Sequence, residues 1–163
     1  MGALLARRKV VVPVAVVVVV LAALALWAFQ PWKLFTSSTI NEQLVSTQST
    51  NTVVGKGSFR SLEHPTSGQA ELVKTADGKA VVQLRDFSTS DGPAVHVWLT
   101  DKAQDAGDSA FGQGGYLDLG SLKATKGNEV YDVPAGTDVS KYRSVLIWCD
   151  RFSVGFGVAP VTA

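Results

Sequence analysis

Three side chains in this sequence have the chemistry to bind a soft metal or to act as a redox group. They are Cys149, the only cysteine, and the two histidines, His64 and His96. A cysteine becomes reactive when its thiol ionises, which a nearby cation favours, and Arg151 follows Cys149 by two residues. The alternative is a packing thiol, because cysteine is among the residue types most often buried. The N-terminal segment described below predicts that the domain is exported. A thiol outside the cytoplasm meets an oxidising environment, which favours a functional role for Cys149.

The same three side chains are the candidates for holding a cofactor. A set of two histidines and one cysteine is typical of copper sites, although Met1 is the only methionine and leaves no weak axial ligand. One cysteine excludes a zinc ribbon and a disulfide framework, and the lack of a C-x-x-C-H motif excludes covalently attached c-type haem. Copper and other forms of haem stay open as cofactors, with Cys149, His64 and His96 as ligands. The sequence has no nucleophile-elbow motif and does not favour a serine hydrolase.

The N-terminal segment predicts a membrane anchor. Residues 10–29 carry no charge, and a helix of that length rises about 30 Å, which matches the hydrocarbon core of a bilayer. Three basic residues at positions 7–9 precede the run, and this asymmetry places residues 1–9 in the cytoplasm. With Trp32 at the interface, the anchor spans residues 10–32. We expect an uncleaved signal-anchor that crosses the cell membrane once, with the following domain outside the cytoplasm.

A cleaved signal peptide is the alternative interpretation of this segment. Ala23, Leu24 and Ala25 form a small-x-small pattern of the kind that signal peptidases cut. The chain stays apolar beyond that point, which favours an anchor. Both interpretations export the rest of the chain.

The part after the anchor divides into a linker and one domain. Residues 33–54 are rich in Ser, Thr, Asn and Gln, and predict a flexible tether, with a short helix over residues 40–45 as the alternative. Residues 55–163 are long enough for one domain with its own core. Their surface is mildly acidic and has no basic stripe, so we expect no nucleic-acid partner.

The domain has the pattern of an all-β protein. Residues 70–84 contain two alternating runs joined by Asp77 and Gly78, which predicts a hairpin with a two-residue turn. Further strands are expected over residues 57–63, 94–100, 116–119, 129–132, 145–149 and 152–158. No segment after the anchor has a helical period. We therefore predict an antiparallel, sandwich-like β domain behind one transmembrane helix.

Alternation within two of these strands separates the candidate residues. In residues 144–149, Cys149 shares a face with Val145 and Ile147, whereas Trp148 points to the other face. In residues 94–100, His96 shares a face with Trp98. Asp86 and Asp91 flank a turn and are expected to form it.

Four segments of the domain resemble the DM thirteen domain, a module associated with DOMON cytochrome domains and described as an electron-transfer domain. The resemblance covers residues 55–159, and its motifs occur in the family's order. The matching residues are Phe59, His64, Gly68, Asp86, Phe87, Gly92, Pro93, Leu119 to Lys123, Trp148, Cys149, Phe156 and Gly157. One departure is Ala94, where the family often has an aspartate.

The resemblance implies a redox role for the family's characteristic cysteine, either as a bare thiol or as the holder of a prosthetic group. In this chain that role falls on Cys149. The chain contains no cytochrome domain, so the resemblance implies that any electron partner is a separate redox protein. Two functions follow: a membrane-tethered redox module that works through Cys149, or a non-catalytic β domain that binds a surface partner and uses Cys149 for packing. An enzyme that turns over a substrate is the weaker expectation.

Overall fold

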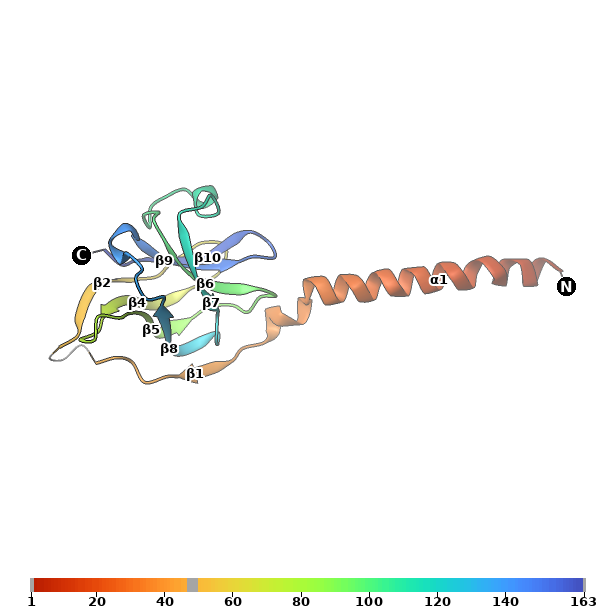
Figure 1. Ribbon diagram of the computed structural model, residues 1–163. Helices are drawn as coiled ribbons and strands as arrows, with labels where there is room; N and C mark the ends of the chain where they lie inside the picture. Colours follow the sequence, from red (N-terminus) through yellow and green to blue (C-terminus); the bar gives the residue numbers. More distant parts are fainter. Residues whose placement is uncertain (1, 47–49, 163) are drawn as a thin grey trace.

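A long apolar helix leads into two β-sheets in the computed structural model, which describes residues 2–46 and 50–162 (Figure 1). Helix α1 (Gly2–Phe29) is followed by the short 3-10 helix η1 (Pro31–Phe35). An 18-residue window within Val11–Lys33 has a mean hydropathy of 2.9, and no residue of that window is buried. The helix is therefore long and apolar enough to cross a membrane, a property that it shares with signal sequences.

The first sheet contains five strands in the order β1-β8-β5-β4-β2. Their bounds are Thr39–Asn41 for β1, Lys126–Val133 for β8, Ala80–Ser88 for β5, Ser67–Lys74 for β4 and Thr52–Ser58 for β2. Neighbouring strands are antiparallel except β1 and β8, which are parallel.

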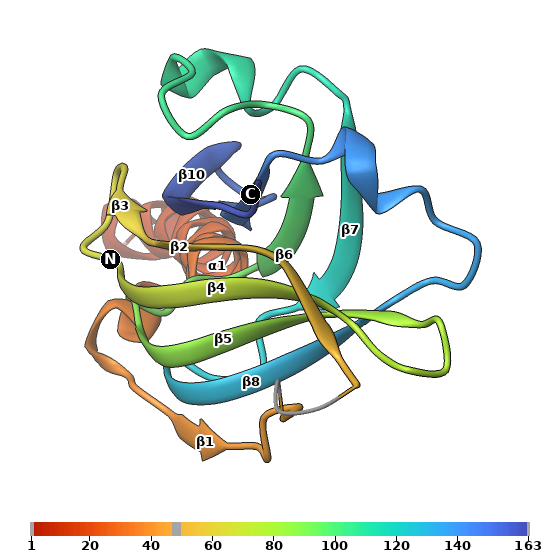
Figure 2. The same ribbon diagram turned by 90° about the vertical axis from the view of Figure 1, so that its left-hand side faces the viewer.

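The second sheet also contains five strands, in the order β3-β10-β9-β6-β7, all antiparallel. Their bounds are Arg60–Ser61 for β3, Val154–Pro160 for β10, Ser144–Cys149 for β9, Val95–Thr100 for β6 and Tyr116–Ser121 for β7. Figure 2 shows the two sheets facing each other, with the helix end behind them. The predicted all-β, sandwich-like fold behind one N-terminal helix is confirmed.

The core lies between the two sheets. Alternate residues of β4, β5 and β8 meet alternate residues of β6, β9 and β10, and the largest fully buried side chains of this layer include Phe87, Leu72 and Leu99. A second apolar cluster covers the outer face of β9, where the connection between β6 and β7 places Phe111 over Trp148 and Leu146. Both faces of β9 are therefore buried.

The predicted hairpin exists, but its turn is different from the expected one. Strands β4 and β5 pair as far as Lys74 and Ala80, and the Gly78 amide donates a hydrogen bond to the Thr75 carbonyl. Within the turn at residues 75–79, only Gly78 has positive φ, at 83°. The connection is thus a type I turn closed by a left-handed glycine, rather than a two-residue turn in which both central residues have positive φ.

Two of the expected segments also differ from the structure. The strand expected over residues 57–63 is broken at Phe59, so β2 ends in the first sheet and β3 begins in the second. The residues expected to form a flexible tether include β1 and the first three residues of β2. Ser38 and Thr125 exchange hydrogen bonds, and the Val45 amide donates to the Gln83 side chain. Residues 40–45 form no helix, and residues 47–49 of the expected tether lie outside the described part.

Candidate functional site

Cys149 is the last residue of β9 and lies inside the core. Its side chain is fully buried, in the same cluster as Val95, Ile147 and Phe156. Val95 of β6 and Val154 of β10 are its partners on either side in the sheet. The sulfur therefore has apolar neighbours and no contact with solvent.

Arg151 does not lie beside the thiol. The chain turns after Asp150, and the Arg151 guanidinium lies 6.0 Å from the centre of the Trp27 ring at the end of α1. The side chain is exposed. Proximity in the sequence was the reason to expect that Arg151 activates Cys149, and the turn removes that reason.

The structure does not bring Cys149, His64 and His96 together. His96 pairs with Trp148 across β6 and β9, so it lies on the outer face of the second sheet, whereas Cys149 points to the inner face. His64 lies in the connection between β3 and β4, where its ring contacts the Phe156 ring at a centroid distance of 3.9 Å. These three residues do not form one copper or haem site.

A prosthetic group does not fit on Cys149 alone either. A haem or a metal ion needs an open position at the sulfur, and the fully buried Cys149 side chain is enclosed by packed apolar residues. The described residues thus do not provide a cofactor cavity at this thiol.

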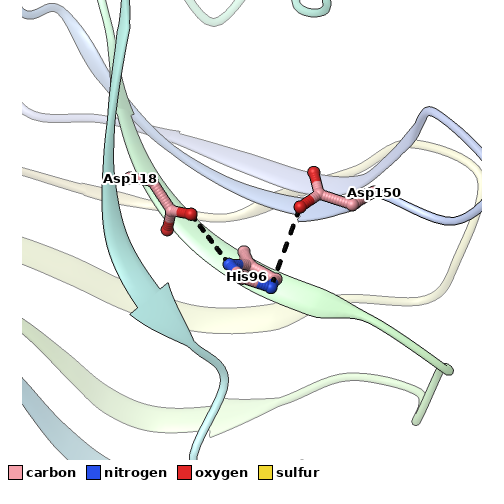
Figure 3. A group of neighbouring side chains, drawn as sticks. All are labelled: His96, Asp118 and Asp150. Carbon is pink, nitrogen blue, oxygen red and sulfur yellow. Dashed lines mark hydrogen bonds and ion pairs between the residues drawn. The ribbon is translucent and has the colours of Figure 1, made fainter.

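His96 instead forms a cluster with two carboxylates (Figure 3). Its Nδ1 lies 2.9 Å from Asp118 Oδ2 on β7, and its Nε2 lies 3.8 Å from Asp150 Oδ2, just after β9. The ligand atoms of the three residues lie within 4.8 Å of one another. One imidazole and two carboxylates can bind a divalent cation such as Zn²⁺ or Mn²⁺, and they also satisfy each other as a hydrogen-bonded network without an ion.

Neither acidic member of this cluster was identified from the sequence. The neighbours of His96 depend on the pairing of β6 with β7 and β9, and alternation within a single strand does not reveal its partner strands. The available signal was weak. Asp150 directly follows Cys149, and Asp118 lies in the expected strand over residues 116–119.

A stack of aromatic rings lies on the same outer face. Tyr116 stacks on Trp98 with a centroid distance of 3.8 Å, and Trp98 stacks on Trp148 with a distance of 5.0 Å. Tyr116 is 44% exposed, whereas Trp98 and Trp148 are buried. The rings thus form a continuous path from the surface to Trp148, the residue before Cys149.

His64 is the third candidate, and its electrostatic environment differs from that of His96. Burial of the ring lowers its pKa below the ordinary value, against an opposing effect of Glu63. Among the described residues, none hydrogen-bonds to its ring nitrogens. The lowered pKa favours the neutral imidazole, which has one N–H donor and one acceptor nitrogen.

A family model for the electron-transfer domain DM13 matches residues 58–161, which is more than half of the chain. The chain belongs to the DM13 electron-transfer family. The match takes in every strand of the DM13 domain from β3 to β10 and includes Cys149, His64 and His96. It leaves out α1 and β1. Comparisons with curated proteins and with solved structures gave no match.

Proposed function

We propose that this DM13 protein is a membrane-tethered electron-transfer module that works outside the cytoplasm through Cys149. Membership of the electron-transfer family carries this proposal. The apolar helix α1 supports the tether, and the basic residues at positions 7–9 support a cytoplasmic N-terminus. A separate redox protein is the expected partner.

Burial of Cys149 limits the mechanism that this proposal allows. Thiol–disulfide exchange requires direct attack by one sulfur on another, and a fully buried thiol is out of reach of a second protein. The transfer therefore has to occur over a distance. The stack of Tyr116, Trp98 and Trp148 supports such a route, because its exposed end is accessible to a partner and its inner end is Trp148. Trp148 precedes Cys149 in β9, with its ring on the opposite face of the sheet.

The test uses the full chain in detergent micelles. The visible absorption spectrum and the metal content of the purified protein are recorded first. A redox titration of the wild type and of the Cys149→Ala variant then follows. We expect a reversible redox transition in the wild type that disappears in Cys149→Ala, while His64→Leu keeps it. A wild type with no absorbing group and no redox transition overturns the proposal.

The orientation needs its own experiment. Protease added to intact cells or spheroplasts should digest the β domain and leave a small anchored fragment. A protected β domain reverses the topology, and a released soluble domain with a new N-terminus near residue 25 indicates a cleaved signal sequence.

The second candidate function is a non-catalytic domain that binds a surface partner or ligand. The observation that favours it is the complete burial of Cys149, which suits a packing thiol as well as a redox group. This function predicts that Cys149→Ala binds its partner as the wild type does and that neither protein has a redox transition.

A further inference from the structure

The end of the apolar helix is fastened to the β domain. The Phe29 and Phe152 rings stack at a centroid distance of 6.0 Å and an interplanar angle of 16°. Lys33 Nζ donates a 3.0 Å hydrogen bond to the Gly92 carbonyl and lies 3.5 Å from an Asp91 carboxylate oxygen. When α1 spans a bilayer, the connections β5–β6 and β9–β10 therefore lie at the membrane surface.

These contacts border a partly open cavity of about 220 Å³ between the helix end and the domain. Most of its wall consists of aromatic rings and prolines from both sides of the junction. They are Phe29, Pro31, His64, Pro93, Phe152 and Phe156. Part of the wall belongs to the end of the candidate membrane span, so an occupant has direct access from the bilayer interface.

The size of the cavity limits the occupant. Pockets for drug-sized ligands have volumes of roughly 300–1,000 Å³. At about 220 Å³ the cavity is smaller than this range, which excludes a macrocycle and suits one or two fused rings.

The polar groups of the cavity favour a neutral ring over an ion. Lys33 and Asp91 both line it and form an ion pair with each other, and Thr36 also donates a 2.6 Å hydrogen bond to Asp91. His64 lies against Phe156 and has no hydrogen-bond partner for its ring nitrogens among the described residues. Because burial lowers the pKa of His64, its ring offers an uncharged N–H donor. A ring carbonyl is the matching acceptor.

We infer that this cavity binds the ring of a lipid-soluble quinone, with His64 donating a hydrogen bond to a quinone carbonyl and the phenylalanine rings contacting its faces. The quinone class rests on the electron-transfer function proposed above, since a quinone is a redox molecule that resides in the bilayer. The size, the apolar wall and the His64 donor come from the cavity itself. Phe156 also belongs to the apolar cluster that contains Cys149, so the bound ring would lie next to that core.

The test uses the full chain in lipid nanodiscs and a decyl-substituted benzoquinone as the probe. Quinones quench tryptophan fluorescence, and Trp27 and Trp32 lie at the helix end that forms the cavity wall. We expect saturable quenching by the wild type. His64→Leu removes one hydrogen bond and should weaken binding about fivefold to tenfold. His64→Gln restores an N–H donor and should recover most of the affinity.

His96→Leu is the matched control, because His96 is also a partly buried histidine but lies on the outer face of the second sheet. It should bind the probe as the wild type does. Quenching that rises linearly with probe concentration, or equal affinity in His64→Leu, overturns the inference. Decylbenzene has the same chain and no carbonyl. If it competes as well as the quinone, the cavity is an acyl-chain site, and the inference is also overturned.

The experiment separates this inference from the proposed function, because it measures binding without any electron transfer. A chain that binds the quinone but has no redox transition refutes the function and keeps the site. A chain with the redox transition and no saturable quinone binding refutes the site alone.

Discussion

Substitution of Cys149 tests whether the thiol is buried as the structure places it. The side chain is fully buried between Val95 and Val154 in the sheet, and its neighbours in the core are apolar. Serine would place a hydroxyl there without an evident partner, at a cost of roughly 1–3 kcal/mol in the free energy of unfolding. Alanine removes the sulfur without adding a polar group, and the loss of one buried methylene-sized group costs about 0.8 kcal/mol before any cavity effect.

Thermal unfolding of the full chain in micelles measures these differences. In a domain of about 100 residues, 1 kcal/mol changes the Tm by about 4–8 °C. We expect Cys149→Ser to lower the Tm by at least that amount and Cys149→Ala to lower it by less than Cys149→Ser. The order of the two variants matters more than either value, because only the hydroxyl reports an unsatisfied polar group.

Thiol chemistry gives an independent measurement on the unmodified protein. Methyl methanethiosulfonate should react with Cys149 only slowly in the native protein and completely after addition of denaturant. Native reaction at the rate of a free cysteine, or a Cys149→Ser variant as stable as the wild type, would refute the burial. The proposed electron transfer over a distance would then lose its basis, and direct thiol–disulfide exchange at Cys149 would become the better interpretation.

Three further predictions concern the fold. Gly78→Val should lower the free energy of unfolding by about 1 kcal/mol or more, because φ is 83° there, whereas Gly107→Val should change it by less than about 0.5 kcal/mol because φ is −61°. Gly127→Ala should release β1 and speed amide exchange there, since its Cβ would lie 1.8 Å from a β1 carbonyl oxygen. Glu129→Gln should gain stability relative to the wild type as the pH rises above about 4.5, because burial raises the pKa of Glu129.

Each of these predictions has an outcome that contradicts it. Equal losses in Gly78→Val and Gly107→Val would mean that the left-handed turn is not formed. Gly120→Ala is the control for Gly127→Ala, since Gly120 has a similar φ of 115° and open space around it; equal exchange in both variants would mean that β1 is not paired. For Glu129, the folded protein holds the proton more tightly than the unfolded chain, so its stability falls as the pH rises through the folded pKa. A stability difference from Glu129→Gln that does not change with pH would refute the raised pKa.

The strands of the β domain could be predicted because their signal is local. Alternating apolar residues mark β6 and β9 without knowledge of the partner strands, and the structure confirms both within one residue. The same method missed β1 and the first half of β2. Strand β1 has three residues, and β2 contains Gly55 and Gly57, so neither carries the alternation that marks a strand. Their place is set by pairing with β8 and β4, which are distant in the sequence.

The candidate site could be predicted only in part, for a similar reason. Alternation placed Cys149 with Val145 and Ile147 on one face of its strand, and the structure has them together in the core. It did not show that the other face of β9 is buried as well, because that depends on Phe111 in the long β6–β7 connection. The meeting of His96 with Asp118 and Asp150 also depends on strand register, which a single sequence does not fix.

If this protein has the proposed function, the contacts around Cys149 and α1 restrict where an electron partner can approach. The thiol is enclosed by the core, so the outer aromatic stack is the described path that reaches its strand from the surface. The helix end contacts the domain through Lys33 and Phe29. Under the proposed function, a soluble partner would approach the Tyr116 end of the stack, and a partner in the bilayer would approach the junction that contains Phe152. Tyr116→Ala should slow exchange with a soluble partner alone, and Phe152→Ala should slow exchange with a membrane partner alone. These two variants separate the two routes within one protein, because each side chain is exposed and lies outside the main core.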